Sequence, residues 1–134
     1  MSLLRVVARM LTGSTYTVLG WEAATEPGAR VGAAADTLAR IRKVVPLPAD
    51  DETIVRANGA AQAVGGAFLA LGLFPRLSTT VLAASLIPTT LAGHEFWTVE
   101  DPDARKQQRV QFQKNAAMLG GLAFAYLDAR RPRD

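Results

Sequence analysis

The stretch ANGAAQAVGGAFLALGLFPRLSTTVLAASLIPTTLAGH, residues 57–94, carries a single formally charged side chain, Arg76. This arginine follows Pro75 and divides the stretch into two nearly equal uncharged halves. At about 1.5 Å per residue, each half would form a helix close to the ~30 Å thickness of bilayer hydrocarbon. A soluble helix of that length normally turns a charged face to water, and neither half has one. The stretch therefore predicts two membrane-spanning helices joined by a tight turn.

The segments around this hairpin predict a single all-α domain over residues 1–134, a four-helix transmembrane bundle. The predicted spans are about 3–24, 54–74, 77–93 and 111–129. Arg5 and Arg9 interrupt the first span, and their long side chains can reach the headgroups while their stems stay in apolar surroundings. An amphipathic helix in the interface is the alternative for that segment. Tyr16 and Trp21 are its amphipathic aromatic residues.

The first loop contains a further helical pattern. Apolar residues recur at three- and four-residue spacing over residues 31–45, opposite basic side chains. This pattern predicts an amphipathic helix that lies in the membrane interface. The acidic residues 50–52 then precede the second span, where they complement the dipole of its helix. In that span, small residues predict close helix–helix approach: Gly59, Ala63, Gly66 and Ala67.

Composition excludes several functions. The chain has no cysteine, so it forms no disulfide, holds no iron–sulfur cluster and performs no dithiol exchange with its own side chains. Its one histidine cannot build a histidine-rich zinc site alone. We predict no catalytic residue, no metal site and no catalysis by this chain on its own.

The net charge of +3 does not indicate a nucleic-acid partner. The basic residues form no stripe with exposed aromatic side chains, and no nucleic-acid-binding module is present. Arg130, Arg131 and Arg133 are instead typical of a basic tail that faces anionic headgroups. The predicted partners are the lipid bilayer and other proteins of a membrane complex.

Two amides in the second span are candidates for a site. Asn58 and Gln62 lie four residues apart, and an amide in lipid must find a hydrogen-bond partner. Gln111 and Asn115 in the last span are the expected partners. The amides then either fix the bundle or form the polar floor of a ligand cleft.

The end of the third span carries the second candidate group. His94 is suited to proton relay or to donating a hydrogen bond to a bound quinone or lipid headgroup, and otherwise it satisfies the end of the helix. Phe96 and Trp97 fit an aromatic anchor at the interface. The predicted ligand-binding set is Asn58, Gln62, His94, Trp97 and Asn115.

Several segments resemble the DoxX family of small bacterial membrane proteins. They are VRANGAAQ at 55–62 with Gly65, Gly66, Gly72 and FPR at 74–76, PTT at 88–90, AGHEFW at 92–97, and QKNAAMLGG at 113–121. The resemblance implies a four-helix integral protein of the bacterial inner membrane. Some relatives are subunits of a thiosulfate:quinone oxidoreductase. Mycobacterial relatives are linked to a membrane complex with a superoxide dismutase and a thiosulfate sulfurtransferase.

Three functions follow from these features. The first is an accessory or anchoring subunit of an inner-membrane redox or oxidative-stress-defence complex. The second is a quinone- or lipid-binding subunit of a membrane oxidoreductase, and the third is a small transporter. The basic residues in the shortest loops favour cytoplasmic termini.

Overall fold

The computed structural model describes residues 2–130, and these residues form helices joined by turns and short loops, with no strand among them. Arg131 and Arg133 of the predicted basic tail lie outside the described residues. The elements are α1 (Leu3–Thr25), α2 (Ala29–Arg42), α3 (Asp51–Leu71), α4 (Pro75–Gly93), the short 3-10 helix η1 (Phe96–Thr98) and α5 (Pro102–Asp128). The prediction of an all-α fold is confirmed.

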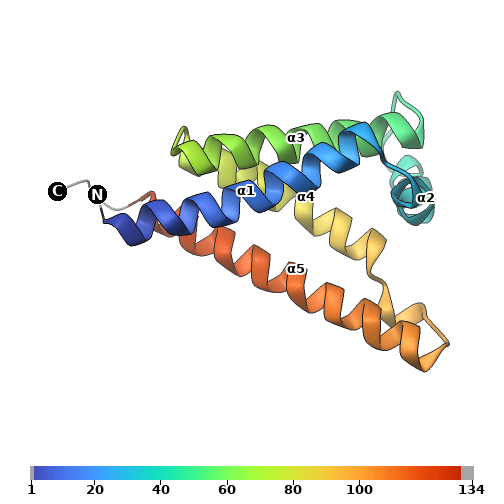
Figure 1. The fold of residues 1–134 in the computed structure, drawn as a ribbon. Coiled ribbons are helices and arrows are strands. Elements are labelled where there is room, and N and C mark those ends of the chain that lie inside the picture. The colour runs from blue at the N-terminus through green and yellow to red at the C-terminus, as the bar shows by residue number, and fades with distance from the viewer. Residues whose placement is uncertain (1, 131–134) are drawn as a thin grey trace.

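The four long helices are α1, α3, α4 and α5, and successive ones run in opposite directions, as Figure 1 shows. Helix α3 lies against α1, α4 packs on α3, and α5 packs on α4 before it reaches the start of α1. The Nε atom of Arg5 lies 3.1 Å from a carboxylate oxygen of Asp128, which joins the start of α1 to the end of α5. Helix α2 and the loop before α3 lie at the opposite end of the molecule.

Glycines bring α1 and α3 into backbone contact. A Cβ added to Gly66 would lie 2.6 Å from the carbonyl oxygen of Gly13, and one added to Gly59 would lie 2.8 Å from that of Gly20. Both distances are too short for real Cβ atoms. The prediction of close approach at Gly59 and Gly66 is therefore confirmed, with α1 as the partner helix.

The core lies where the four long helices meet. Its buried side chains come from all four: Tyr16, Leu69, Leu82, Leu86 and Leu122. Helix α5 contributes only Leu122 to the fully buried set and is otherwise partly or fully exposed. The outer surface of the bundle consequently carries many large apolar side chains.

Helix boundaries follow local capping. Asp50 accepts a hydrogen bond from the backbone N–H of Thr53 and starts α3, and Asp101 accepts one from Ala104 and starts α5. Helix α5 therefore begins at Pro102, well before the predicted span at 111–129. The helical pattern in the first loop forms α2, which ends at Arg42 rather than continuing to residue 45.

The sequence predicts four membrane spans among the helices of residues 2–130. None of these helices contains a segment that combines the length and the apolar character of a membrane span.

Candidate functional site

The two amides of α3 meet hydroxyl groups of α4. Gln62 Nε2 donates to Ser85 Oγ over 2.9 Å, and Ser85 Oγ donates to Asn58 Oδ1 over 2.7 Å. Asn58 Nδ2 donates in turn to Thr89 Oγ1 over 3.1 Å. Ser85 thus bridges the two amides, and one continuous chain of hydrogen bonds joins α3 to α4.

Asn115 of α5 reaches the other side of α4. Its Nδ2 donates to Thr90 Oγ1 over 3.0 Å, and that hydroxyl donates to the carbonyl oxygen of Leu86 over 2.8 Å. We call Asn58, Gln62, Ser85, Thr89, Thr90 and Asn115 the polar seam. The expectation that Gln111 and Asn115 would bond the α3 amides is wrong, because α4 packs against both α3 and α5 and supplies the hydroxyls itself.

Burial varies along the polar seam. Gln62, Ser85 and Thr90 are buried, whereas Asn58 is only partly buried and Thr89 is exposed. The Gln62–Ser85 bond therefore lies inside the bundle, and the Asn58–Thr89 bond lies at its surface. A buried amide that lacks a partner costs about 1–3 kcal/mol, so these bonds favour one relative placement of α3 and α4.

His94 and Trp97 lie at the end of α4 and in η1. His94 ends α4, and its Nδ1 lies 2.8 Å from Oε1 of Gln108 on α5. The ring of Trp97 lies 5.2 Å from that of Phe96 and 6.0 Å from that of Phe112, both in edge-on geometry. These contacts hold the first half of α5 against the end of α4.

The five predicted site residues thus lie at different helix contacts. Asn58 and Gln62 lie between α3 and α4, whereas Asn115 and His94 join α4 to α5. Sequence reasoning missed the hydroxyl partners and Gln108. Ser85 and Thr89 are four residues apart, as are Thr90 and His94, which is the spacing of neighbours on a helix surface. This spacing is the signal in the sequence that α4 supplies the common hydrogen-bond partners.

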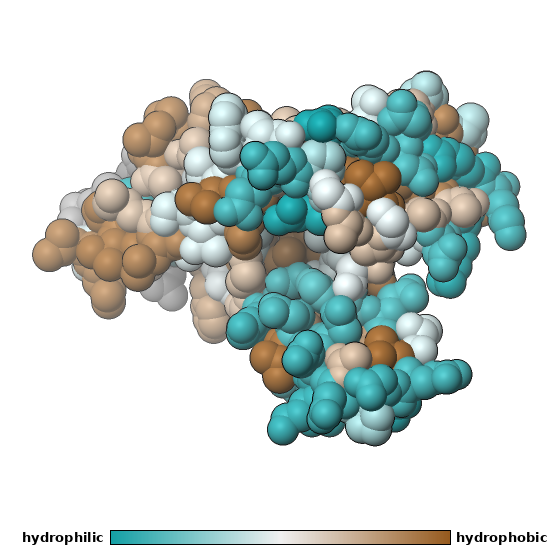
Figure 2. Space-filling view, turned by 45° about the vertical axis from the view of Figure 1, so that its right-hand side comes forward, coloured by the Kyte–Doolittle hydropathy of each residue, from teal (hydrophilic) through white to brown (hydrophobic). Residues whose placement is uncertain are grey.

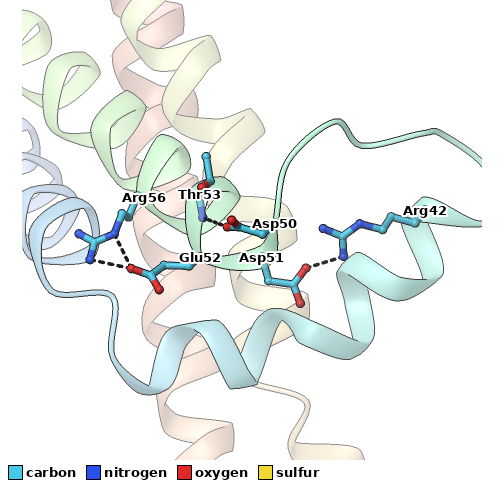
Figure 3. A pocket seen from close by; sticks show the side chains of 6 residues that line it. All are labelled: Arg42, Asp50, Asp51, Glu52, Thr53 and Arg56. Carbon is cyan, nitrogen blue, oxygen red and sulfur yellow. Dashed lines mark hydrogen bonds and ion pairs between the residues drawn. The ribbon is translucent and has the colours of Figure 1, made fainter.

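Figure 3 shows a charged hollow at the start of α3. Arg42 forms an ion pair with Asp51 and donates to the carbonyl oxygen of Ala49 over 2.8 Å. Arg56 pairs with Glu52 at 2.8 Å. The charges that line this hollow therefore largely satisfy one another.

Two residues of this hollow cap helices through hydrogen bonds. Nη1 of Arg56 donates to the last carbonyl oxygens of α1, those of Ala24 and Thr25, over 2.7 and 2.9 Å. Hydrogen bonds from the backbone N–H and the side chain of Thr53 lower the pKa of Asp50, and the nearby positive charge of Arg42 adds to the effect. Both interactions are those expected of capping residues.

The model of the DoxX family matches residues 4–95, which include Asn58, Gln62 and His94 but not α5. No curated protein matches the chain. No solved structure matches it either.

Proposed function

The chain belongs to the DoxX family, and from this premise we propose that it is an integral, accessory subunit that anchors a redox or oxidative-stress-defence complex in the bacterial inner membrane. Family membership indicates association with a membrane. The proposed bundle crosses the bilayer through α1, α3, α4 and α5, with α2 in the interface and both termini on the cytoplasmic side.

The outer surface of the bundle supports a lipid environment. Each of the four long helices exposes large apolar side chains, among them Leu11, Val18, Val64, Leu77, Ile87 and Phe124. Figure 2 shows hydrophobic surface toward one end of the molecule and hydrophilic surface over the other. Apolar patches that extend over several elements mark contact with lipid or with another protein.

The polar seam is the observation that supports the accessory role. The amides of Asn58, Gln62 and Asn115 all donate to hydroxyl groups of α4. This arrangement supports interhelical hydrogen bonding, which fixes a membrane bundle with about 0.6 kcal/mol per contact on average. The lack of cysteine supports a subunit that leaves sulfur chemistry to its partners.

One observation favours the second function, a quinone- or lipid-binding subunit. The Asn58–Thr89 bond lies at the surface of the bundle, where a lipophilic ligand with a carbonyl group can reach it. This alternative keeps Asn58, Gln62, His94, Trp97 and Asn115 as its ligand-binding set.

Carbonate washing of native membranes tests the integral assignment. We expect the chain to stay in the pellet together with known multi-pass proteins. Release into the carbonate supernatant, where peripheral proteins are found, would overturn it.

Purification in mild detergent tests the role. We expect the chain to retain redox proteins and to bind no added menaquinone. Menaquinone binding that disappears in the double variant Gln62→Ala/His94→Ala, with the fold intact by circular dichroism, would replace the accessory role with the alternative. Arg109→Gln, an exposed change on α5, is the control variant.

A further inference from the structure

Several arginines lie at one end of the bundle. The start of α1, the end of α3, the start of α4 and the end of α5 meet there, on the left of Figure 1. Among residues 2–130, this end holds four arginines and one acidic residue. We call Arg5, Arg9, Arg76 and Arg130 the arginine end.

Arg9 is inserted against the turn between α3 and α4. A Cβ on Gly72 would lie 2.9 Å from Nη1 of Arg9 and 3.1 Å from its Cζ, so the guanidinium occupies the space that a side chain would fill. Gly72 also has a φ of +74°, which glycine adopts most easily. This glycine therefore both ends α3 and admits the arginine.

Arg9 has no carboxylate partner within the described part of the chain. Its Nε is buried and makes no hydrogen bond there. The last carbonyl groups of α3 carry partial negative charge and favour a cation at this position. This partial charge is weaker than the full countercharge that a carboxylate or a phosphate would supply.

Among residues 2–130, the single carboxylate at this end already has a partner. Asp128 pairs with Arg5 at 3.1 Å. Arg76 donates from Nε to the carbonyl oxygen of Ala129 over 3.2 Å, a neutral acceptor. Helix α4 also starts here without an acidic residue in its first turn, so the positive end of its dipole adds to the arginines.

Exposed apolar side chains lie on the same helix ends as these cations. They are Leu3, Leu4, Leu71, Leu73, Phe74, Leu77 and Leu127. In Figure 2, hydrophobic surface gathers on the left of the view, the side on which Figure 1 places the start of α1. A nucleic acid matches the charge but leaves this apolar surface in water, whereas an anionic phospholipid matches both the charge and the apolar surface.

We propose that the arginine end binds the phosphate of an anionic phospholipid, with the Arg9 guanidinium as the principal cation and the acyl chains on the apolar surface. This inference rests on the proposed membrane location and adds a lipid class to it. Arginine suits the role because its planar guanidinium bonds phosphate through two N–H groups. Long basic side chains reach headgroups while their stems stay among apolar groups. The site is separate from the polar seam.

Lipid titration of the purified chain tests the proposal. The chain in neutral detergent is titrated with phosphatidylglycerol, with phosphatidylcholine and with inorganic phosphate, and thermal unfolding is followed. We expect phosphatidylglycerol alone to raise the unfolding temperature. Loss of a charge-assisted hydrogen bond in Arg9→Gln should weaken phosphatidylglycerol binding about tenfold.

Arg109→Gln on the exposed first half of α5 is the matched control, and we expect it to bind phosphatidylglycerol like the wild type. Equal stabilisation by phosphatidylcholine would overturn the proposal. An equal effect of phosphate alone, or an equal loss in Arg109→Gln, would also overturn it. If Arg9→Gln does not fold, the exposed pair Arg76→Gln/Arg130→Gln decides, and unchanged affinity in that variant contradicts the proposal.

The carbonate wash separates the two proposals. If wild type and Arg9→Gln both stay in washed membranes but bind phosphatidylglycerol equally, the lipid site fails and the membrane location stands. If both are released by carbonate, the membrane location fails whatever the titration shows.

Discussion

Tyr16 lies in the core of the bundle with 1% of its surface exposed, and its phenol oxygen has no hydrogen-bond partner among residues 2–130. Because an unpaired buried hydroxyl is unfavourable, we expect Tyr16→Phe to leave the free energy of unfolding unchanged or to raise it by up to about 1 kcal/mol. Tyr16→Ala should lower it by about 3–5 kcal/mol through the cavity it leaves. Denaturant unfolding in detergent measures both. A loss of more than about 1 kcal/mol in Tyr16→Phe would show that the hydroxyl is hydrogen-bonded.

The burial of Tyr16 could not be predicted from the residue type alone. Tyr16 and Trp21 look alike in the sequence as amphipathic aromatic residues of one helix, yet Tyr16 is in the core and Trp21 is 65% exposed. The need of Asn58 and Gln62 for partners was predictable, because an amide in apolar surroundings must be bonded. Their partners were not, because these depend on which helices are neighbours and on how far each is shifted along the other.

Asp50 gives a pH-dependent prediction. Its folded-state pKa lies below the ordinary value of 3.8, chiefly because of the hydrogen bond from the Thr53 N–H. A lowered carboxyl pKa stabilises the fold above the unfolded-state pKa, and this contribution is lost as the pH falls through the folded-state pKa. We expect the unfolding temperature of the wild type to fall more steeply below about pH 4 than that of Asp50→Asn. Thermal scans from pH 7 down to strongly acid pH measure this, and parallel profiles would contradict it.

At the scale of elements, the contact between α1 and α3 decides the packing. A methyl group on Gly66 would lie 2.6 Å from both the carbonyl oxygen of Gly13 and the backbone nitrogen of Thr17, so Gly66→Ala must push the two helices apart. We expect a loss of about 1–3 kcal/mol of stability from this overpacking. Thermal or denaturant unfolding measures it.

Gly120 on α5 is the matched control. A Cβ there would meet nothing within 4 Å, so Gly120→Ala should instead gain up to about 1 kcal/mol from helix propensity. Equal changes in the stability of Gly66→Ala and Gly120→Ala would contradict this prediction. They would show that helix propensity, rather than the backbone contact with α1, determines the effect at Gly66.

The helices themselves were predictable where charge was absent. The uncharged halves of residues 57–94 form most of α3 and α4. The turn between them lies at residues 72–74, slightly before the predicted position at Phe74–Arg76, because Pro75 is the first residue of α4. Helix α5 was harder to delimit, because charged side chains at 103–109 resemble a loop. Its actual start, Asp101 followed by Pro102, is a regular helix-start pattern that outweighs the charge density.

At the scale of the whole molecule, charge and apolar surface are arranged along the bundle. The arginine end has one acidic residue within residues 2–130, whereas α2, the loop before α3 and the start of α5 carry both signs. The family match covers α1 to α4 and stops before α5. The part of the chain that the family model matches is thus also the part that holds the closest helix contacts and three of the five predicted site residues.

The absence of cysteine permits a direct test of the proposed topology. Ser2 precedes α1 at the arginine end, and Thr98 lies in η1 beyond the opposite end of α4; both are exposed. Single substitutions Ser2→Cys and Thr98→Cys provide one thiol each on an otherwise thiol-free chain. If the bundle crosses the bilayer with cytoplasmic termini, a membrane-impermeant maleimide should label Thr98→Cys in intact spheroplasts and Ser2→Cys only in inverted vesicles. Labelling of both thiols from the same side would contradict the crossing, and the exposed apolar side chains would then have to lie on one leaflet or on a protein partner.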